Sequence, residues 1–461
     1  MTFTFSWKCI NKMNKFKELG INEEILKSIE RLNYKEPTEI QKQTIPLMLE
    51  GKDVIAQSAT GSGKTLCFGS AIIENIAHKN KIQALIMTPT RELAEQIFES
   101  MKTFSKYRKL KIAVIYGGVS YNPQFKALET ADIVVGTPGR LLDHLERRTM
   151  NLSNVGHLVL DEADRMLDMG FLDDVGKIIS QCKKEKQTMF FSATFPSELD
   201  ALATRFMNNP TKVVVDCYVD PKKLKQVYYN IDNNMKFSLL VHLLKKENTG
   251  LVMVFCNSRH STDFVTNGLS KQGIKALAIH GGLTQNKRTN VIKKFNSKAT
   301  FVLVCTDVAA RGLDIPGVSH VYNYDIPNES KQYVHRIGRT ARAGESGIAI
   351  NLLSNRDHDN FAKVLQEFDV NIEKLERPYI EKVKLSLNMN RNRNGRSFSG
   401  RSGNNSGGRP SGNYGRGNAS NASNHSGSQR FSKSNRFGKK KFGSRDSSRP
   451  KPEMSNSIFN R

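Results

Sequence analysis

The feature that most constrains this chain is a series of short, continuous apolar runs, each ending in polar residues and separated by longer amphipathic stretches. "ALIMTPT", "LVLDEAD" and "TMFFSAT" are examples. Strands buried on both faces read as unbroken apolar segments, so the pattern predicts a parallel sheet covered by helices on both sides. In such sheets ligands bind at the carboxyl edge, where the polar residues stand. The first half has expected strands at 53–58, 84–90, 112–118, 133–138, 158–164, 188–194 and 213–216.

The second half of the chain repeats this rhythm. Its expected strands lie at 251–258, 276–282, 301–307, 320–327 and 347–354. A chain of 461 residues is also too long for one core. We therefore expect two similar α/β domains, at 13–215 and 225–380, joined by a linker at 216–224 that contains Pro221.

Charge is unevenly distributed along the chain. The whole chain carries 70 Lys and Arg against 44 Asp and Glu, a net charge of +26, and residues 388–461 alone carry 16 against 2, a net +14. Such a balance favours a polyanionic partner. From residue 385 onward the chain is rich in Arg, Gly, Asn and Ser, which predicts a disordered basic tail. Its interleaved aromatic residues suit single-stranded nucleic acid, although a purely solubilising tail remains an alternative. These aromatic residues are Phe398, Tyr414, Phe431, Phe437 and Phe442.

Composition also excludes several classes of protein. No apolar run approaches the roughly 20 residues that span a bilayer, and no secretory signal is evident. Six scattered cysteines without a CxxC pair predict buried free thiols in a reducing cytosol, not a disulfide framework or a zinc site. We therefore expect a cytoplasmic protein with no membrane partner. Residues 1–12 are expected to be a disordered extension, or to precede a true start at Met13.

The segment "SATGSGKT" (58–65) resembles a phosphate-binding loop, but Ser58 stands in place of its first glycine. A strand precedes it and an amphipathic helix follows, which is the context that such a loop requires. Lys64 would then contact the β- and γ-phosphates of a nucleotide, and Thr65 would bind Mg²⁺. On the loop alone, a simple Gly/Ser turn between two elements remains an alternative.

Asp161 and Glu162 follow an apolar strand of the same domain. A phosphate-loop enzyme needs one carboxylate for Mg²⁺, which suits Asp161, and a polar group to orient the attacking water, which suits Glu162. The alternative is a pair of solvated acids at a helix start, favoured by the helix dipole. That alternative does not explain why they share a domain with the Gly-Lys-Thr loop.

Residues 161–164 spell Asp-Glu-Ala-Asp, and with this motif the chain resembles the DEAD-box RNA helicases of superfamily 2 over residues 16–354. The motif order and the short basic tail are most similar to the bacterial RhlE-type branch. The loop without its first glycine is common in the family, whereas Asn33 and Ala341 stand where the family usually has glycine. The matching segments are "YKEPTEIQ" (34–41), "SATGSGKT" (58–65), "PTRELA" (89–94), "GG" (117–118), "TPGR" (137–140), "SAT" (192–194), "VFCNSR" (254–259), "QNKR" (285–288), "TDVAARGLDIPGV" (306–318) and "HRIGRTARAG" (335–344).

The resemblance implies two tandem RecA-like domains and a set of site residues. The nucleotide-binding set is Phe16, Gln41, Thr60, Gly61, Ser62, Gly63, Lys64, Thr65 and Asp314. The catalytic set is Lys64, Asp161, Glu162, His335, Arg339 and Arg342, with Thr65 and Asp161 on the metal. Asp164, Ser192 and Thr194 would couple the motifs, and RNA would contact Arg91, Gly118, Thr137, Arg140, Arg288 and Thr306.

Some of these roles follow from side-chain chemistry. The Gln41 amide can hydrogen-bond to the donor and acceptor edge of adenine, and the Phe16 ring can stack on the face of the purine. Arg336, Arg339 and Arg342 recur every three residues, so in a helix they would drift by roughly 60° per step and share one broad face. The resemblance implies that the last two are arginine fingers.

Together these features predict an ATP- and Mg²⁺-dependent RNA helicase, monomeric in its core, that separates short duplexes locally. A DNA translocase of the same superfamily and a non-enzymatic RNA chaperone are the rival hypotheses. The "YKEPTEIQ" and "DEAD" segments argue against the first, and the intact catalytic set against the second. Neither the bound RNA nor the pathway, whether ribosome assembly, RNA decay or cold adaptation, follows from the sequence.

Overall fold

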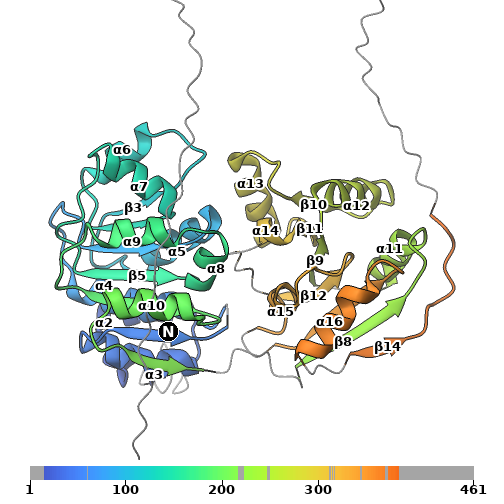
Figure 1. The fold of residues 1–461 in the computed structure, drawn as a ribbon, viewed down its shortest axis with the longest axis horizontal. Helices are drawn as coiled ribbons and strands as arrows, with labels where there is room; N and C mark the ends of the chain where they lie inside the picture. Colours follow the sequence, from blue (N-terminus) through green and yellow to red (C-terminus); the bar gives the residue numbers. More distant parts are fainter. Residues whose placement is uncertain are drawn as a thin grey trace, which may run out of the picture. The chain divides into compact units, whose positions relative to one another are not determined.

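The computed structural model describes residues 15–59, 61–215, 223–246, 250–310, 313, 315, 317–342, 345–368 and 372–383. They form two seven-stranded sheets, one from each half of the chain, and every strand pairing is parallel (Figure 1). This confirms two tandem RecA-like α/β domains. The residues preceding 15, the linker residues 216–222 and the basic tail lie outside the described residues.

The first sheet has the strand order β3-β4-β2-β5-β6-β1-β7. Its strands are β1 (Val54–Gln57), β2 (Ala84–Met87), β3 (Ile112–Ile115), β4 (Ile133–Gly136), β5 (His157–Asp161), β6 (Gln187–Ser192) and β7 (Thr211–Val214). Each strand expected in this half is present and ends one to three residues before the expected bound, while β5, β6 and β7 begin one or two residues earlier than expected. The apolar runs located the strands correctly because both faces of this sheet are covered.

Helices cover both faces of the first sheet. They are α2 (Glu23–Arg31), α3 (Glu39–Leu49), α4 (Lys64–Asn75), α5 (Arg91–Phe104), α6 (Asn122–Leu128), α7 (Pro138–Glu146), α8 (Ala163–Asp168), α9 (Leu172–Ile179) and α10 (Ser197–Phe206). Neighbouring strand residues enter different cores: Val54 and Ala56 pack with α2 to α5, whereas Ile55 packs with α7 to α10. The alternation of side chains along a strand places them on opposite faces.

The second sheet repeats the plan with the order β10-β11-β9-β12-β13-β8-β14. Its strands are β8 (Leu224–Asn230), β9 (Leu251–Cys256), β10 (Ala276–Ile279), β11 (Val302–Thr306), β12 (Val318–Asn323), β13 (Gly347–Leu353) and β14 (Glu373–Leu375). Its helices are α11 (Lys236–Lys246), α12 (Arg259–Lys271), α13 (Gln285–Asn296), α14 (Asp307–Ala310), α15 (Ser330–Ile337) and α16 (His358–Phe368).

Two strands of the second sheet, β8 and β14, were absent from the sequence prediction. β8 alternates buried and exposed residues instead of forming an apolar run, and β14 has only three residues. β14 is the edge strand and β8 is its neighbour, a side of the sheet where burial is incomplete and the hydrophobic signal weakens. Consequently the expected linker, 216–224, extends one residue into β8.

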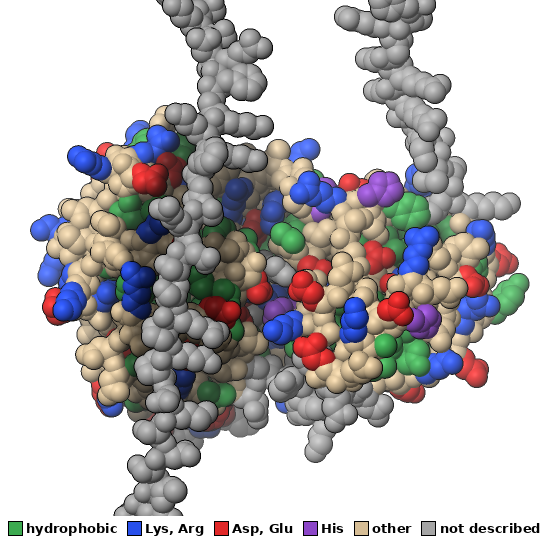
Figure 2. Space-filling view, viewed as in Figure 1, with side chains coloured by type: hydrophobic (Ala, Val, Ile, Leu, Met, Phe, Trp, Pro, Cys, Tyr) green, Lys and Arg blue, Asp and Glu red, His purple; other side chains and the backbone are tan. Residues whose placement is uncertain are grey.

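The described cysteines Cys67, Cys182, Cys256 and Cys305 are free thiols, and all but Cys182 are buried, as expected. Among the helices that the structure describes, none is both long enough and apolar enough to cross a membrane. Lys and Arg side chains are interspersed with Asp and Glu on the face shown in Figure 2. This face of the described part therefore presents no single-sign patch.

Candidate active site

The phosphate-binding loop connects β1 to α4, as predicted. Gly63 caps α4 with a φ of 90°, and Gly61 has a φ of 80°, values that L side chains rarely adopt. At Gly63 space is also lacking, because a Cβ there would collide with the amide of Gln41. Lys64 opens α4, so its neighbouring backbone N–H groups stand at a helix N-terminus, where anions are stabilised.

Ser58, the residue in place of the first glycine, has specific contacts. Its N–H donates to the Ser192 carbonyl at 3.0 Å, and its hydroxyl lies 2.9 Å from that of Ser62. Its carbonyl accepts a hydrogen bond of 3.1 Å from the Lys64 ammonium. A small hydroxyl side chain therefore fits this position and links the two ends of the loop.

Gln41 lies against the same loop. Its Oε1 accepts from the Thr38 N–H at 3.0 Å, which caps α3, and its Nε2 donates to the Gly63 carbonyl at 3.0 Å. The Thr38 hydroxyl also donates to the Ser62 carbonyl at 2.8 Å. Gln41 thus positions the phosphate loop in this structure, a role that the sequence reasoning did not include.

Phe16 does not lie where the expected stacking on adenine would need it. Its side chain is 1% exposed and packs in the core with Ile25 and Ile29 of α2. A ring covered on all sides offers no face to a base, so the structure corrects this expectation. The aromatic residue of the "YKEPTEIQ" segment, Tyr34, is in contrast 43% exposed.

Asp161 ends β5, and Glu162 follows it as the N-cap of α8. Both are buried, at 4% and 5% exposure. Burial raises the pKa of the Asp161 carboxyl to about 6, although the charge of Lys64 opposes the shift. Glu162 adopts left-handed backbone angles, φ 55° and ψ 50°, and its carboxylate binds Arg165 at 2.9 Å. The two adjacent acids therefore have different cations nearby, Lys64 for Asp161 and Arg165 for Glu162.

Asp164 connects the acidic segment to the end of β6. Its Oδ2 accepts hydrogen bonds from the N–H and hydroxyl of Thr194 at 2.9 and 3.1 Å, and its own N–H donates to the Ser192 hydroxyl at 3.1 Å. Burial raises the pKa of Asp164, but the Thr194 hydrogen bond and the charges of Arg165 and Lys64 outweigh it, and the pKa lies below its ordinary value. These contacts physically join the two segments that were expected to be coupled.

The expected RNA-contacting residues of the first domain follow a different set of strands. Arg91 follows β2, Gly118 follows β3, and Thr137 follows β4, in the half of the sheet opposite to β6 and β1. Gly118 has a φ of 81°, and the Arg91 guanidinium occupies the space that a Cβ would need. The strand order thus separates the two groups of residues along one edge of the sheet.

Arg140 is held by its neighbours on α7 and the loop after β3. Both terminal nitrogens donate to the Val119 carbonyl at 3.3 Å, and the guanidinium lies 3.9 Å from the ring centroid of Tyr121. Arg147 contacts the same ring at 4.7 Å, and the Tyr121 hydroxyl donates to Asp143. Arg140 is only 9% exposed, so it supports the loop that follows Gly118.

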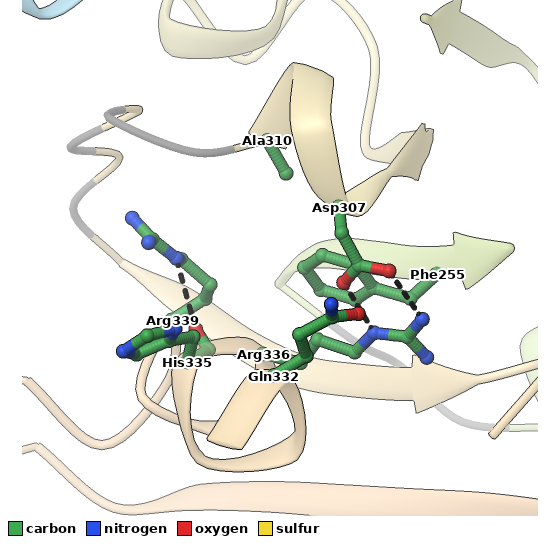
Figure 3. Close-up of a pocket in the computed structure, with 7 residues that line it drawn as sticks. All are labelled: Phe255, Asp307, Ala310, Gln332, His335, Arg336 and Arg339. Atoms are coloured by element: carbon green, nitrogen blue, oxygen red, sulfur yellow. Dashed lines mark hydrogen bonds and ion pairs between the residues drawn. The ribbon is translucent and has the colours of Figure 1, made fainter. Parts of the chain in front are cut away.

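In the second domain Arg336 lies on α15, is fully buried and faces Asp307 (Figure 3). Its Nε and Nη2 each donate to a different oxygen of Asp307 at 2.6 Å, and Nη2 also donates to Asn257 at 2.7 Å. The same guanidinium lies 5.2 Å from the ring of Phe255. Arg336 therefore joins the carboxyl ends of β9 and β11.

The three arginines do not share one helical face, because the segment is not helical throughout, as that expectation required. α15 ends at Ile337, so Arg336 lies on the helix, whereas Arg339 and Arg342 lie beyond it. Arg339 donates to the Leu313 and His335 carbonyls at 2.5 and 3.2 Å, and Arg342 donates to the Gly338 carbonyl at 2.7 Å. His335 and Arg339 line a small pocket beside the Arg336–Asp307 pair (Figure 3).

The remaining expected residues are placed as follows. Arg288 lies on α13, and Thr306 ends β11 and is buried. Ser62 and Thr65 belong to the loop and the start of α4. Thr60 and Asp314 lie outside the described residues.

Comparison with known proteins agrees with this geometry. A family model described as DEAD/DEAH box helicase matches residues 38–202, and one described as helicase conserved C-terminal domain matches residues 235–344. A relative from Limosilactobacillus reuteri named ATP-dependent RNA helicase CshA is 45% identical over 348 residues, 75% of this chain and 70% of the relative. The Geobacillus kaustophilus relative, DEAD-box ATP-dependent RNA helicase CshA, is 42% identical over 374 residues, 80% of each chain. The chain belongs to the DEAD-box RNA helicases. It is therefore an ATP-hydrolysing enzyme that acts on RNA.

Solved helicase structures show the same fold. S. cerevisiae Dbp5 bound to RNA and ADP BeF3 matches with a TM-score of 0.72 and 31% identity, covering 78% of this helicase and 95% of that chain. A structure of the DEAD-box helicase Mss116 bound to ssRNA and UDP-BeF also matches with a TM-score of 0.72, at 29% identity and 80% coverage of each chain.

Sequence reasoning missed several residues of this helicase. Asp307 stood inside a recognised motif and Arg165 directly after one, but only their partners, Arg336 and Glu162, show what they do. Tyr121 had no signal beyond its position three residues after Gly118. A charged residue directly after a strand, as Asp307 is, was the one sequence feature that could have identified it.

Proposed function

We propose that the carboxyl edge of the first sheet binds ATP and Mg²⁺. The observation that carries this is the meeting of Lys64, Asp161 and Ser192 at the ends of adjacent strands β1, β5 and β6. Among the described residues no cluster of three His, Cys, Asp or Glu side chains could hold a metal alone. One carboxylate and one hydroxyl, Asp161 and Thr65, nevertheless fit Mg²⁺, which is usually held by one or two carboxylates together with substrate phosphates and waters.

In this proposal each residue has one task. Lys64 would neutralise phosphate charge, Asp161 and Thr65 would hold Mg²⁺, which would supply further positive charge to the phosphates, and the Glu162 carboxylate would orient the attacking water. The Gln41 amide would recognise adenine by exchanging its contacts with Thr38 and Gly63 for the base, which would link base binding to the shape of the loop.

The second domain would complete catalysis. Arg339 and Arg342 would stabilise the charge on the transferred phosphoryl group when the domains close on ATP, with His335 beside them. Asp164, Ser192 and Thr194 would couple hydrolysis to this closure, because they join the acidic segment to β6.

RNA would bind the other half of the sheet edges through its backbone, at Arg91, Gly118, Thr137, Arg140, Arg288 and Thr306. Phosphate contacts position a strand without reading its sequence. Local separation of short duplexes is therefore expected, with the basic tail increasing affinity for any RNA. The orientation of Arg140 toward Val119 supports a role in holding the loop at Gly118 in shape.

Steady-state ATPase assays with RNA, with DNA and without nucleic acid test this function. Stimulation by RNA alone is expected. Equal stimulation by DNA would favour the DNA translocase, and RNA annealing without ATP turnover would favour the chaperone. Replacing Mg²⁺ by EDTA is expected to abolish turnover while leaving RNA binding by the tail in place.

Finer assignments remain proposals. The relatives described above are named CshA, so they do not support the expected RhlE-type branch. A cytoplasmic location, a monomeric core and a role in ribosome assembly or RNA decay are likewise proposed. An inventory of RNAs crosslinked to the protein in cells would test the pathway most directly.

A further inference from the structure

Arg165 and Glu162 form an ion pair inside the first domain. Nη1 of Arg165 donates to Oε2 of Glu162 at 2.9 Å, and the two side chains are only 3% and 7% exposed. Nη2 of the same guanidinium is buried and has no hydrogen-bond partner among the described residues. Arg165 is therefore a buried cation with incompletely satisfied donors.

Such an arrangement is costly for stability. Desolvating an arginine and leaving part of it without an acceptor usually outweighs the attraction to one carboxylate, and apolar replacements of buried pairs are often neutral or stabilising. Costs of this kind persist mainly at functional sites. The energetics thus point away from a purely structural reason for Arg165.

The backbone directs the two side chains toward each other. Glu162 adopts the left-handed region, which is strained for a residue other than glycine. Arg165 lies one helical turn further along α8, and its N–H donates to the Glu162 carbonyl and to the Asp164 carboxylate, both at 3.0 Å. The strained turn and the first turn of α8 together fix the geometry of the pair.

The local charges explain why Glu162 needs a cation. Asp161, Glu162 and Asp164 place three carboxylates within four residues, all of them buried. The Lys64 ammonium donates to the Ser58 carbonyl of the phosphate loop, whereas Arg165 contacts Glu162 directly. Without Arg165, the carboxylate of Glu162 would face its two acidic neighbours without a cation in contact.

We propose that Arg165 is a positioning residue that holds one carboxylate oxygen of Glu162, so that the other oxygen faces the attacking water. This inference rests on the proposed role of Glu162 in hydrolysis. Arg165 touches neither substrate nor metal in this proposal; it acts only through Glu162. Its removal should therefore affect the chemical step and leave ATP and RNA binding intact.

A double-mutant cycle tests the inference in the full-length chain. The variants are Arg165→Met, Arg165→Lys, Glu162→Gln and Arg165→Met with Glu162→Gln, and kcat and KM for ATP are measured at saturating RNA. Arg165→Met should lower kcat at least tenfold with KM within twofold, and Arg165→Lys should recover part of the loss. The double variant should be no slower than Glu162→Gln alone, because the effects of substituting residues that act as a unit are not additive.

Lys177→Met is a matched control. Lys177 pairs with Asp174 at the same three-residue spacing, but at 3.6 Å and with the lysine 64% exposed. This variant should leave kcat unchanged.

Three results would overturn the inference: a kcat for Arg165→Met within twofold of wild type, a loss confined to KM, or a double variant slower than Glu162→Gln by the full factor of the Arg165 single variant. If Arg165→Met does not fold, the same cycle with Arg165→Lys decides by the same criterion. Turnover by Glu162→Gln within a few-fold of wild type would instead refute the proposed role of Glu162. An inactive Glu162→Gln beside an active Arg165→Met would refute only the inference.

Discussion

Arg336 binds both carboxylate oxygens of Asp307, each at 2.6 Å, in the interior of the second domain. Removing one partner of a buried pair leaves an uncompensated charge, which typically costs about 3–5 kcal/mol. Asp307→Ala should therefore lower the free energy of unfolding by an amount in this range, measured by urea denaturation followed by circular dichroism. Glu367→Gln, on the exposed side of α16, should change it by less than about 0.5 kcal/mol. Equal effects of the two variants would contradict the structural role of the pair.

The contact between Tyr121 and Arg140 predicts an effect on RNA binding. Tyr121→Ala removes the ring beneath the guanidinium, and a cation–π contact of about 0.5–1 kcal/mol corresponds to a loss of about two- to fivefold in RNA affinity. Tyr121→Phe keeps the ring and should bind RNA like wild type. Fluorescence anisotropy with a labelled single strand measures both, and ATP affinity should stay constant. An equal loss for Tyr121→Phe and Tyr121→Ala would show that the hydrogen bond to Asp143 matters instead of the ring.

The tail and the arginine fingers should have separable effects. Deleting residues 388–461 removes a net charge of +14, so RNA affinity should fall and its salt dependence should flatten as fewer counterions are released. Its kcat at saturating RNA should change little. Arg342→Ala should leave RNA affinity nearly unchanged and lower kcat on the order of 10³-fold. ATPase and RNA-binding assays at two salt concentrations compare the two variants. A tail deletion that abolishes kcat would contradict the separate roles of the tail and the arginine fingers.

Both positions at which this chain departs from the family's glycine have positive φ, 55° at Asn33 and 54° at Ala341. Alanine is strained there by about 1–2 kcal/mol, whereas asparagine visits this region readily. Glycine also raises the conformational entropy of the unfolded chain, which lowers the free energy of unfolding by about 0.4–1 kcal/mol. Ala341→Gly should thus stabilise the protein by up to about 1 kcal/mol, and Asn33→Gly should not. Thermal unfolding monitored by calorimetry would distinguish them; a lower Tm for Ala341→Gly would rule out strain at this site.

His157 makes the stability depend on pH. Burial lowers the pKa of His157, with a hydrogen bond to Gln187 opposing and Lys183 adding to the shift. An unfolded histidine binds its proton near pH 6.5, whereas the folded one does so only at lower pH. Between these values the unfolded state binds more protons, so stability falls as pH decreases from above 6.5 to the lowered pKa.

His157→Gln should therefore lose less stability than wild type between pH 7.5 and pH 6, measured as the change in Tm. The exposed His260→Gln should follow the wild-type curve. Parallel curves for wild type and His157→Gln would contradict the prediction.

The sequence by itself determined the two parallel sheets, the phosphate loop and the order of the motifs. These features are local: an apolar run makes a buried strand, and a glycine loop between a strand and a helix makes a cradle, whatever lies elsewhere. The same locality explains the failures at β8 and β14, because the alternating β8 and the three-residue edge strand β14 contain too little apolar sequence to give a signal.

Only the tertiary structure decided where individual side chains point. Arg336 turns inward because Asp307 and Asn257, which lie 29 and 79 residues away, accept its hydrogen bonds. Arg339 leaves the helix because α15 ends at Ile337. Phe16 enters the core because α2 covers it. The direction of a side chain depends on which distant groups satisfy its charge or cover its surface, and residue spacing along the chain carries no information about them.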